Sequence, residues 1–112
     1  MKLKEVRDIL QADVLSGEEF LDAEVCSAFG SDLMSDVLAH VNNQALLLTG
    51  LVSPQTIRTA EMMDMSCVVF VRGKTPSDAM LELALDREMV VMATEMRMHQ
   101  ACGLLYSHGL TG

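Results

Sequence analysis

The sequence predicts an α/β fold, a three-layer sandwich with a mainly parallel sheet of about five strands and helices on both faces. From about residue 44 onward, short apolar segments alternate with polar turns and helical segments, which is the pattern of βαβ units. The apolar segments are continuous rather than alternating, as in strands of a sheet that is covered on both faces. Pro and Gly in the intervening turns mark where strands end and helices begin.

The first part of the chain is less regular. Leu3, Val6, Ile9 and Leu10 have the spacing of a short amphipathic helix. Residues 12–15 could form a short strand, and residues 23–29 are a second candidate strand. Between these two segments, Ser16-Gly17 predicts a turn that leads into an acidic stretch.

A helix is expected next, with Gly30-Ser31-Asp32 as its cap. Its apolar stripe would consist of Leu33, Val37, Leu38 and Val41.

Three strand–helix units follow. The strands are predicted at residues 44–48, 67–71 and 89–93, and the helices end near residues 63, 86 and 107. Ser53 before Pro54 and Thr75 before Pro76 place a capping hydroxyl ahead of a proline at the first helical position. Thr94 before Glu95 predicts a third capped helix start.

Length and composition limit the functions to consider. The 112 residues suggest a single domain over 1–112, and with 50% hydrophobic and 21% charged residues a disordered chain is excluded. No apolar run is long enough to span a bilayer and no signal peptide is evident, so a cytoplasmic location is expected. The net charge of −8 argues against nucleic-acid and anionic membrane partners.

The carboxyl edge of the sheet is the predicted place for a ligand. Turns at that edge would bring together backbone N–H groups at helix starts, glycines that admit a close approach, and the densest positive charge of the chain. An anionic group, such as a phosphate, is the expected guest. The candidate ligand-binding residues are Ser31, Thr49, Gly50, Arg72, Gly73, Lys74 and Thr94. The alternative is that these residues form ordinary turns and caps.

Other chemistry has little support. Asp32, Asp36 and His40 recur every fourth residue, but a solvated helix face explains them better than a metal site. Cys26, Cys67 and Cys102 are widely spaced without a CxxC pair, and Cys67 is predicted to be a core residue. No nucleophile elbow or phosphate-binding motif occurs, so neither an enzyme nor a cofactor is expected. The 10 methionines could fill the core or form an adaptable interface.

Two stretches resemble known domains. Residues 3–25, with Val14-Leu15-Ser16-Gly17-Glu18-Glu19 inside them, look like the opening of the HPr kinase/phosphorylase N-terminal domain. Residues 46–105 look like the DRTGG domain, which is similar in fold to that kinase domain. Thr94 matches the threonine that precedes the last helix of the DRTGG family.

The chain departs from the DRTGG pattern at its name-giving motifs. Leu51-Val52 stands where the family has Asp-Arg, and Arg72-Gly73-Lys74 stands where it has Thr-Gly-Gly. Ala93 replaces the usual Asp before Thr94. A ligand that depends on the missing Asp-Arg pair is therefore not transferred to this chain.

The resemblance implies a non-catalytic regulatory or assembly module. DRTGG domains beside CBS domains help form dimers, so a homodimer that binds a partner protein is expected. Short DRTGG proteins resemble those encoded beside iron-only hydrogenase and redox-enzyme genes, which suggests a partner of that kind. The alternative is a sensor of a small phosphate- or nucleotide-containing ligand. Kinase activity is not implied, because the family's catalytic loop belongs to a separate domain.

Overall fold

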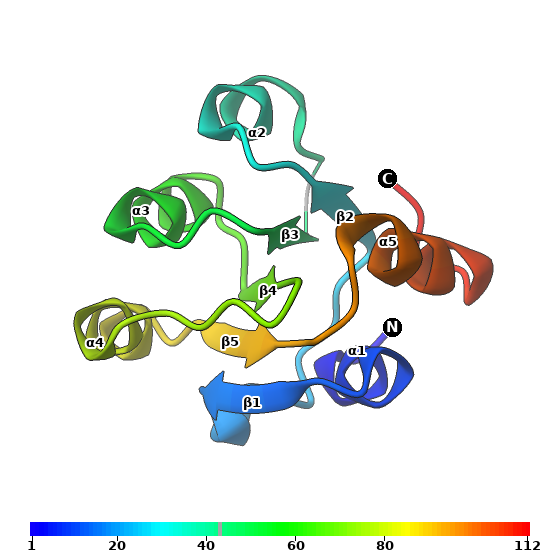
Figure 1. The fold of residues 1–112 in the computed structure, drawn as a ribbon, viewed down its shortest axis with the longest axis horizontal. Helices are drawn as coiled ribbons and strands as arrows, with labels where there is room; N and C mark the ends of the chain where they lie inside the picture. The colour runs from blue at the N-terminus through cyan, green and yellow to red at the C-terminus, as the bar shows by residue number, and fades with distance from the viewer. Residues whose placement is uncertain (43) are drawn as a thin grey trace.

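The computed structural model describes residues 1–42 and 44–112 and has a five-stranded sheet between two layers of helices (Figure 1). The strands are β1 (Asp13–Ser16), β2 (Ser27–Gly30), β3 (Ala45–Thr49), β4 (Cys67–Phe70) and β5 (Val90–Ala93). Their order across the sheet is β1-β5-β4-β3-β2. The predicted α/β fold class is confirmed.

Four of the strands run parallel. β2, β3, β4 and β5 pair in parallel register, and β1 pairs antiparallel with β5 at one edge of the sheet. α1 (Leu3–Leu10) precedes β1, so β1 is the first strand of the chain and no crossover helix connects it to a preceding strand. The carboxyl ends of the four parallel strands therefore lie at one edge of the sheet.

Helices cover both faces (Figure 1). One layer holds α2 (Met34–His40), α3 (Pro54–Met62) and α4 (Asp78–Asp86), and the other holds α1 and α5 (Met98–Ser107). A short 3-10 helix, η1 (Glu18–Phe20), follows β1. Among the described residues, no helix has the length and apolar character that crossing a bilayer requires.

The core lies in two parts, one on each side of the sheet. Leu46 and Leu48 of β3 face α1 and α5, whereas Leu47 between them faces the layer of α2, α3 and α4. The strands β3, β4 and β5 are buried along their whole length, which explains why they carry continuous apolar segments.

Most methionines belong to this core rather than to the surface. Five side chains are buried, and Met62 is the large exception, with 71% of its surface exposed. The remaining methionines are partly buried and pack against the core. The buried methionines are Met34, Met65, Met80, Met89 and Met92.

The predicted helix starts are correct at α3 and wrong at α4 and α5. Ser53 caps α3 by accepting a hydrogen bond from the Gln55 amide, and Pro54 is the first helical residue. In α4 the capping residue is Ser77, not Thr75, because the loop continues past Pro76 before the helix begins. Thr94 does not cap α5, which starts only at Met98.

The predicted start of α2 is wrong, and only Val37 and Val41 of its predicted apolar stripe pack against the core. Leu33 is the N-cap residue, and no side chain of the described residues caps the helix; Gly30 ends β2, and Ser31 and Asp32 lie in the loop ahead of α2. Met34 and Val37 face the core, whereas Leu33 and Leu38 are 58% and 45% exposed. Met34, which the sequence did not place on the stripe, is buried there instead of Leu33 and Leu38.

Candidate functional site

The loops that follow the parallel strands meet at the carboxyl edge of the sheet. They are residues 31–33 after β2, 50–53 after β3, 71–77 after β4 and 94–97 after β5. The predicted ligand-binding residues all lie in these loops or at the strand ends that enter them. The structure thus brings together the backbone segments that the sequence placed at one edge.

Asp32 lies at the centre of the contacts between these loops. Its Oδ1 accepts hydrogen bonds from the amide of Gly50 at 2.6 Å and from the hydroxyl of Thr49 at 3.3 Å. Its Oδ2 pairs with Nη2 of Arg72, also at 3.3 Å. Asp32 therefore connects the loops after β2, β3 and β4.

The sequence placed Asp32 in a turn at this edge but did not include it among the candidate ligand-binding residues. It was interpreted as one of three polar residues on a helix face, together with Asp36 and His40, but it lies in the loop before α2. A carboxylate directly after a parallel strand, with Thr-Gly after the next strand, is the signal that could have identified it.

Gly50 and Arg72 fit together closely. A Cβ atom at position 50 would overlap the guanidinium group of Arg72, so the missing side chain makes room for that group. The Gly50 amide, followed by the Arg72 guanidinium and the Thr49 hydroxyl, lowers the pKa of Asp32, although partial burial opposes this shift. The carboxylate of Asp32 is thus held in its charged form.

The loop after β4 is fixed by its neighbour after β5. Arg72 and Gly73 both have positive φ, 60° and 69°. Their amides donate to Met96 O at 2.8 Å and to Thr94 O at 2.9 Å. The Gly73 backbone packs against the carboxylate of Glu95 so closely that a Cβ atom there would lie 2.6 Å from Oε2. The loop after β5 therefore places Arg72 beside Asp32.

Thr94 and Ser31 use their hydroxyls within the chain. Thr94 is buried, donates to Leu10 O at 2.8 Å and accepts from the Met96 amide at 3.3 Å. Ser31 Oγ accepts from the Leu33 amide at 3.0 Å. Thr94 therefore joins the end of α1 to the loop after β5.

The sequence predicted that backbone N–H groups at this edge are free to bind a ligand, but in the structure those of the predicted residues are already paired. Those of Ser31, Gly50, Arg72, Gly73 and Lys74 all donate to groups within the chain. The side chains of Arg72 and Lys74 remain accessible, and the Arg72 side chain keeps 40% of its surface exposed. Ligand binding by the seven residues remains a prediction, and its chemistry would come mainly from these two cations.

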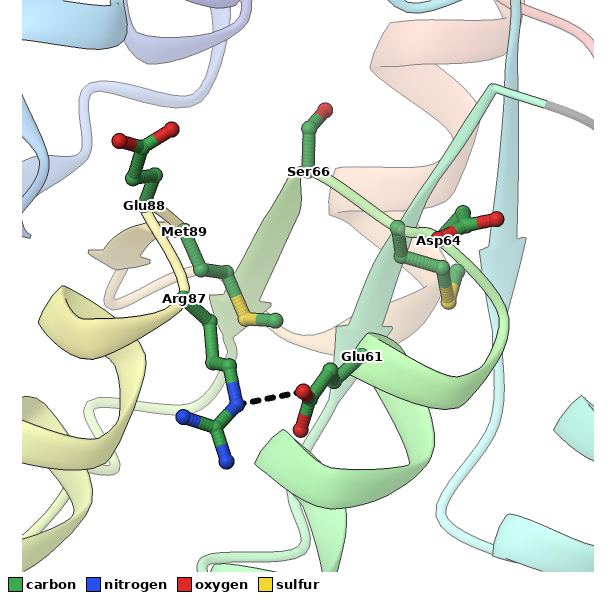
Figure 2. Close-up of a pocket in the computed structure, with 7 residues that line it drawn as sticks. Glu61, Asp64, Ser66, Arg87, Glu88 and Met89 are labelled. Carbon is green, nitrogen blue, oxygen red and sulfur yellow. Dashed lines mark ion pairs between the residues drawn. The ribbon is translucent and has the colours of Figure 1, made fainter.

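Pockets also lie away from this edge. One, of about 330 Å³, lies at the opposite, amino edge of the sheet between the ends of α3 and α4 (Figure 2). In this pocket Arg87 Nε pairs with Glu61 Oε1 at 2.5 Å, and Ser66 and Met89 also line it. The sequence did not predict this pocket, because it depends on how two helix ends pack together.

Two smaller pockets flank the sheet. One of about 240 Å³ lies between β2 and α5, lined in part by Gly30, Cys102 and Tyr106. The other, of about 270 Å³, lies between β1 and α4 beside Leu81 and Leu85. None of these three pockets is lined by one of the seven predicted residues.

The cysteines differ in burial. Cys67 lies fully buried in β4, which confirms it as a core residue, and burial raises the pKa of its thiol. Cys102 is partly buried, and its thiol pKa is also raised by burial. Cys26 is exposed, and its thiol contacts Gln44 Oε1.

The fold is similar to that of a solved structure of the CBS and DRTGG domains from the regulatory region of Clostridium perfringens pyrophosphatase, complexed with the activator diadenosine tetraphosphate. The TM-score is 0.74 at 18% sequence identity, over 93% of this chain and 45% of that chain. The present chain thus spans less than half the length of the chain it resembles. The protein has a DRTGG-like fold, which confirms the resemblance seen in the sequence.

No protein-family model and no curated protein matches the chain.

Proposed function

We propose that the chain is a non-catalytic regulatory module that binds the anionic group of a small molecule at the carboxyl edge of its sheet. The observation that carries this proposal is the Asp32 carboxylate, which is held there by donors from two loops. Those contacts are chemically suited to any carboxylate or phosphate oxygen. The similar fold in a regulatory region complexed with a nucleotide activator supports a regulatory role.

Two cations are exposed at the same edge, beside the carboxylates of Asp32 and Glu95. The chain carries a net charge of −8, so most of its surface repels anions. Arg72 and Lys74 are exposed in one loop at this edge, and the guanidinium of Arg72 has more N–H donors than the one it gives to Asp32. These two side chains are the proposed contacts for a phosphate or carboxylate group.

Thermal-shift measurements with inorganic phosphate, mononucleotides and dinucleoside polyphosphates test the proposal. A ligand at a hundredfold excess over its Kd should raise the stability by about 2.7 kcal/mol. The shift should be lost in the double variant R72Q/K74Q and kept in Arg58→Gln, which removes an exposed cation from α3. Silence across the panel, or an equal loss in Arg58→Gln, would overturn the proposal.

A homodimer that binds a partner protein, of the redox or hydrogenase-associated kind that the family resemblance suggests, is the second candidate. Exposed apolar side chains on the layer of α2 and α3 favour it, because Leu33, Leu38 and Met62 are each more than 40% exposed. Light scattering should then give twice the monomer mass, and Leu38→Glu should return the protein to a monomer. A wild-type monomer at high concentration would contradict the dimer.

A further inference from the structure

We propose that Asp32 is a built-in competitor, an internal carboxylate that occupies an anion subsite made by Gly50, Thr49 and Arg72. This inference rests on the proposed function, because it assigns part of the same edge to a specific chemistry. An incoming carboxylate or phosphate would take the position of the Asp32 carboxylate and accept the same hydrogen bonds. The bound ligand would thereby loosen the contact between the loop before α2 and the loop after β3.

The donors of the subsite are fixed without help from Asp32. Thr49 is fully buried at the end of β3, and its Oγ1 accepts a hydrogen bond from the Leu51 amide at 3.1 Å. With that lone pair engaged, the hydroxyl hydrogen is free to point at the carboxylate, 3.3 Å away. The amide of Gly50 follows directly in the chain and has the shorter contact, 2.6 Å.

Arg72 is held over the same position from the other side. Its amide is anchored to Met96 O at 2.8 Å, which fixes the backbone from which the side chain extends. The guanidinium packs against the Gly50 backbone, where any side chain would displace it. One backbone amide, one buried hydroxyl and one guanidinium thus converge on a volume that two anionic oxygens can fill.

The acceptor, in contrast, is an exposed side chain in a loop. Asp32 is half exposed, and the helix that follows it has only 7 residues and no side-chain cap. The Ser31 amide donates to Leu48 O of β3 at 3.0 Å, so the backbone before Asp32 is anchored to the sheet and only the Asp32 side chain needs to move. The carboxylate can therefore leave without disturbing the buried strands, and the donors would stay in place for a ligand.

A ligand can bind only to molecules in which the competitor has left the subsite. The apparent affinity is therefore the intrinsic affinity multiplied by the fraction of such molecules. If Asp32 occupies the subsite about nine-tenths of the time, its removal tightens ligand binding about tenfold. The competitor would set the concentration at which the module responds. Displacement would also loosen the contact between the loop before α2 and the loop after β3, while α2 stays packed through the buried Met34 and Val37.

Titration with inorganic phosphate, followed by NMR at the Gly50 amide, tests the inference. We expect Asp32→Ala to bind phosphate about tenfold more tightly than the wild type. Asp36→Ala is the matched control, because it removes an exposed carboxylate one helical turn away and should leave the Kd unchanged. Asp32→Asn, which keeps the side-chain shape, replaces Asp32→Ala if the latter fails to fold, and a gain in affinity is expected there too.

The outcomes separate the two proposals. One outcome is that the wild type and the Asp32 variants bind phosphate equally well and that R72Q/K74Q abolishes the binding. That result overturns the role of Asp32 as a competitor and leaves the proposed function intact. An equal gain in Asp32→Ala and Asp36→Ala also overturns it, because the effect would then be one of net charge. If no variant binds phosphate at the Gly50 amide, the subsite is rejected, and the panel of larger ligands decides the proposed function alone.

Discussion

The amide nitrogen of Gly50 lies 2.6 Å from Oδ1 of Asp32, so the loop after β3 holds the loop after β2 by a charge-assisted hydrogen bond. Arg72 adds a contact to the other oxygen of the same carboxylate at 3.3 Å. The relationship joins residues 18 positions apart in the sequence and makes the edge a single connected network. Its strength can be measured through its dependence on pH.

Removing the charge of Asp32 should have an effect that depends on pH. The folded-state pKa of Asp32 is lowered, mainly by the Gly50 amide, so its contribution to stability is present above the ordinary value of about 3.9. The contribution is lost as the pH falls through the lower, folded-state pKa. Asp32→Asn should cost at most about 1 kcal/mol at neutral pH, because the pair is half exposed, and less in acid.

Urea unfolding of the wild type and Asp32→Asn between about pH 2 and pH 7 measures this difference. Asp36→Asn makes the same change of charge without a contact to Gly50, and its effect serves as the baseline. A stability difference that stays constant over the whole range would show that the Asp32 contact does not depend on ionisation.

Gly17 and Gly103 should respond in opposite ways to alanine. Gly17 has a φ of +79°, and a Cβ atom there would lie 2.9 Å from Met89 O, a backbone atom that cannot easily move. Gly17→Ala should therefore destabilise the protein by about 2 kcal/mol or more. Gly103 lies within α5 with nothing near its Cβ position, so Gly103→Ala should stabilise by about 0.5–1 kcal/mol. Thermal unfolding of both variants checks the signs.

Replacement of Thr94 by valine should be costly. The substitution keeps the shape but leaves Leu10 O and the Met96 amide without their side-chain partner at a buried position. We expect a loss of about 1–3 kcal/mol in the free energy of unfolding. Thr94→Ser keeps the hydroxyl and should retain most of the stability in the same urea titration. A larger loss in Thr94→Ser than in Thr94→Val would assign the effect to the methyl group instead.

The three thiols should react at very different rates with iodoacetamide. Cys26 is exposed, whereas burial raises the thiol pKa of Cys102 and, more strongly, that of Cys67. Labelling followed by mass spectrometry of the folded protein should modify Cys26 first, Cys102 slowly and Cys67 only after unfolding. Rapid labelling of Cys67 in the folded protein would contradict its place in the core.

The sequence correctly predicted the elements whose burial is visible as a continuous run of apolar residues. The three apolar strand segments and the helix capped by Ser53 were predicted correctly. Strands buried on both faces require continuous apolar residues, and a capping hydroxyl before proline is a local signal of a helix start. Thr75 and Thr94 carried the same local signal but do not cap helices. Their loops are instead held by bonds to other parts of the chain, such as that from Thr94 to Leu10.

The alternation of apolar segments and capped helical segments determined the α/β fold. It also placed the candidate residues at one edge, because the carboxyl ends of parallel strands lie at the same edge of a sheet. Only the tertiary structure decided that β1 joins the sheet antiparallel and that Asp32 meets Gly50 and Arg72. Local propensity acts within a few residues, whereas strand order and loop contacts depend on packing between distant segments. The pairing of Asp32 with Arg72, 40 residues apart, is a property of the assembled sheet.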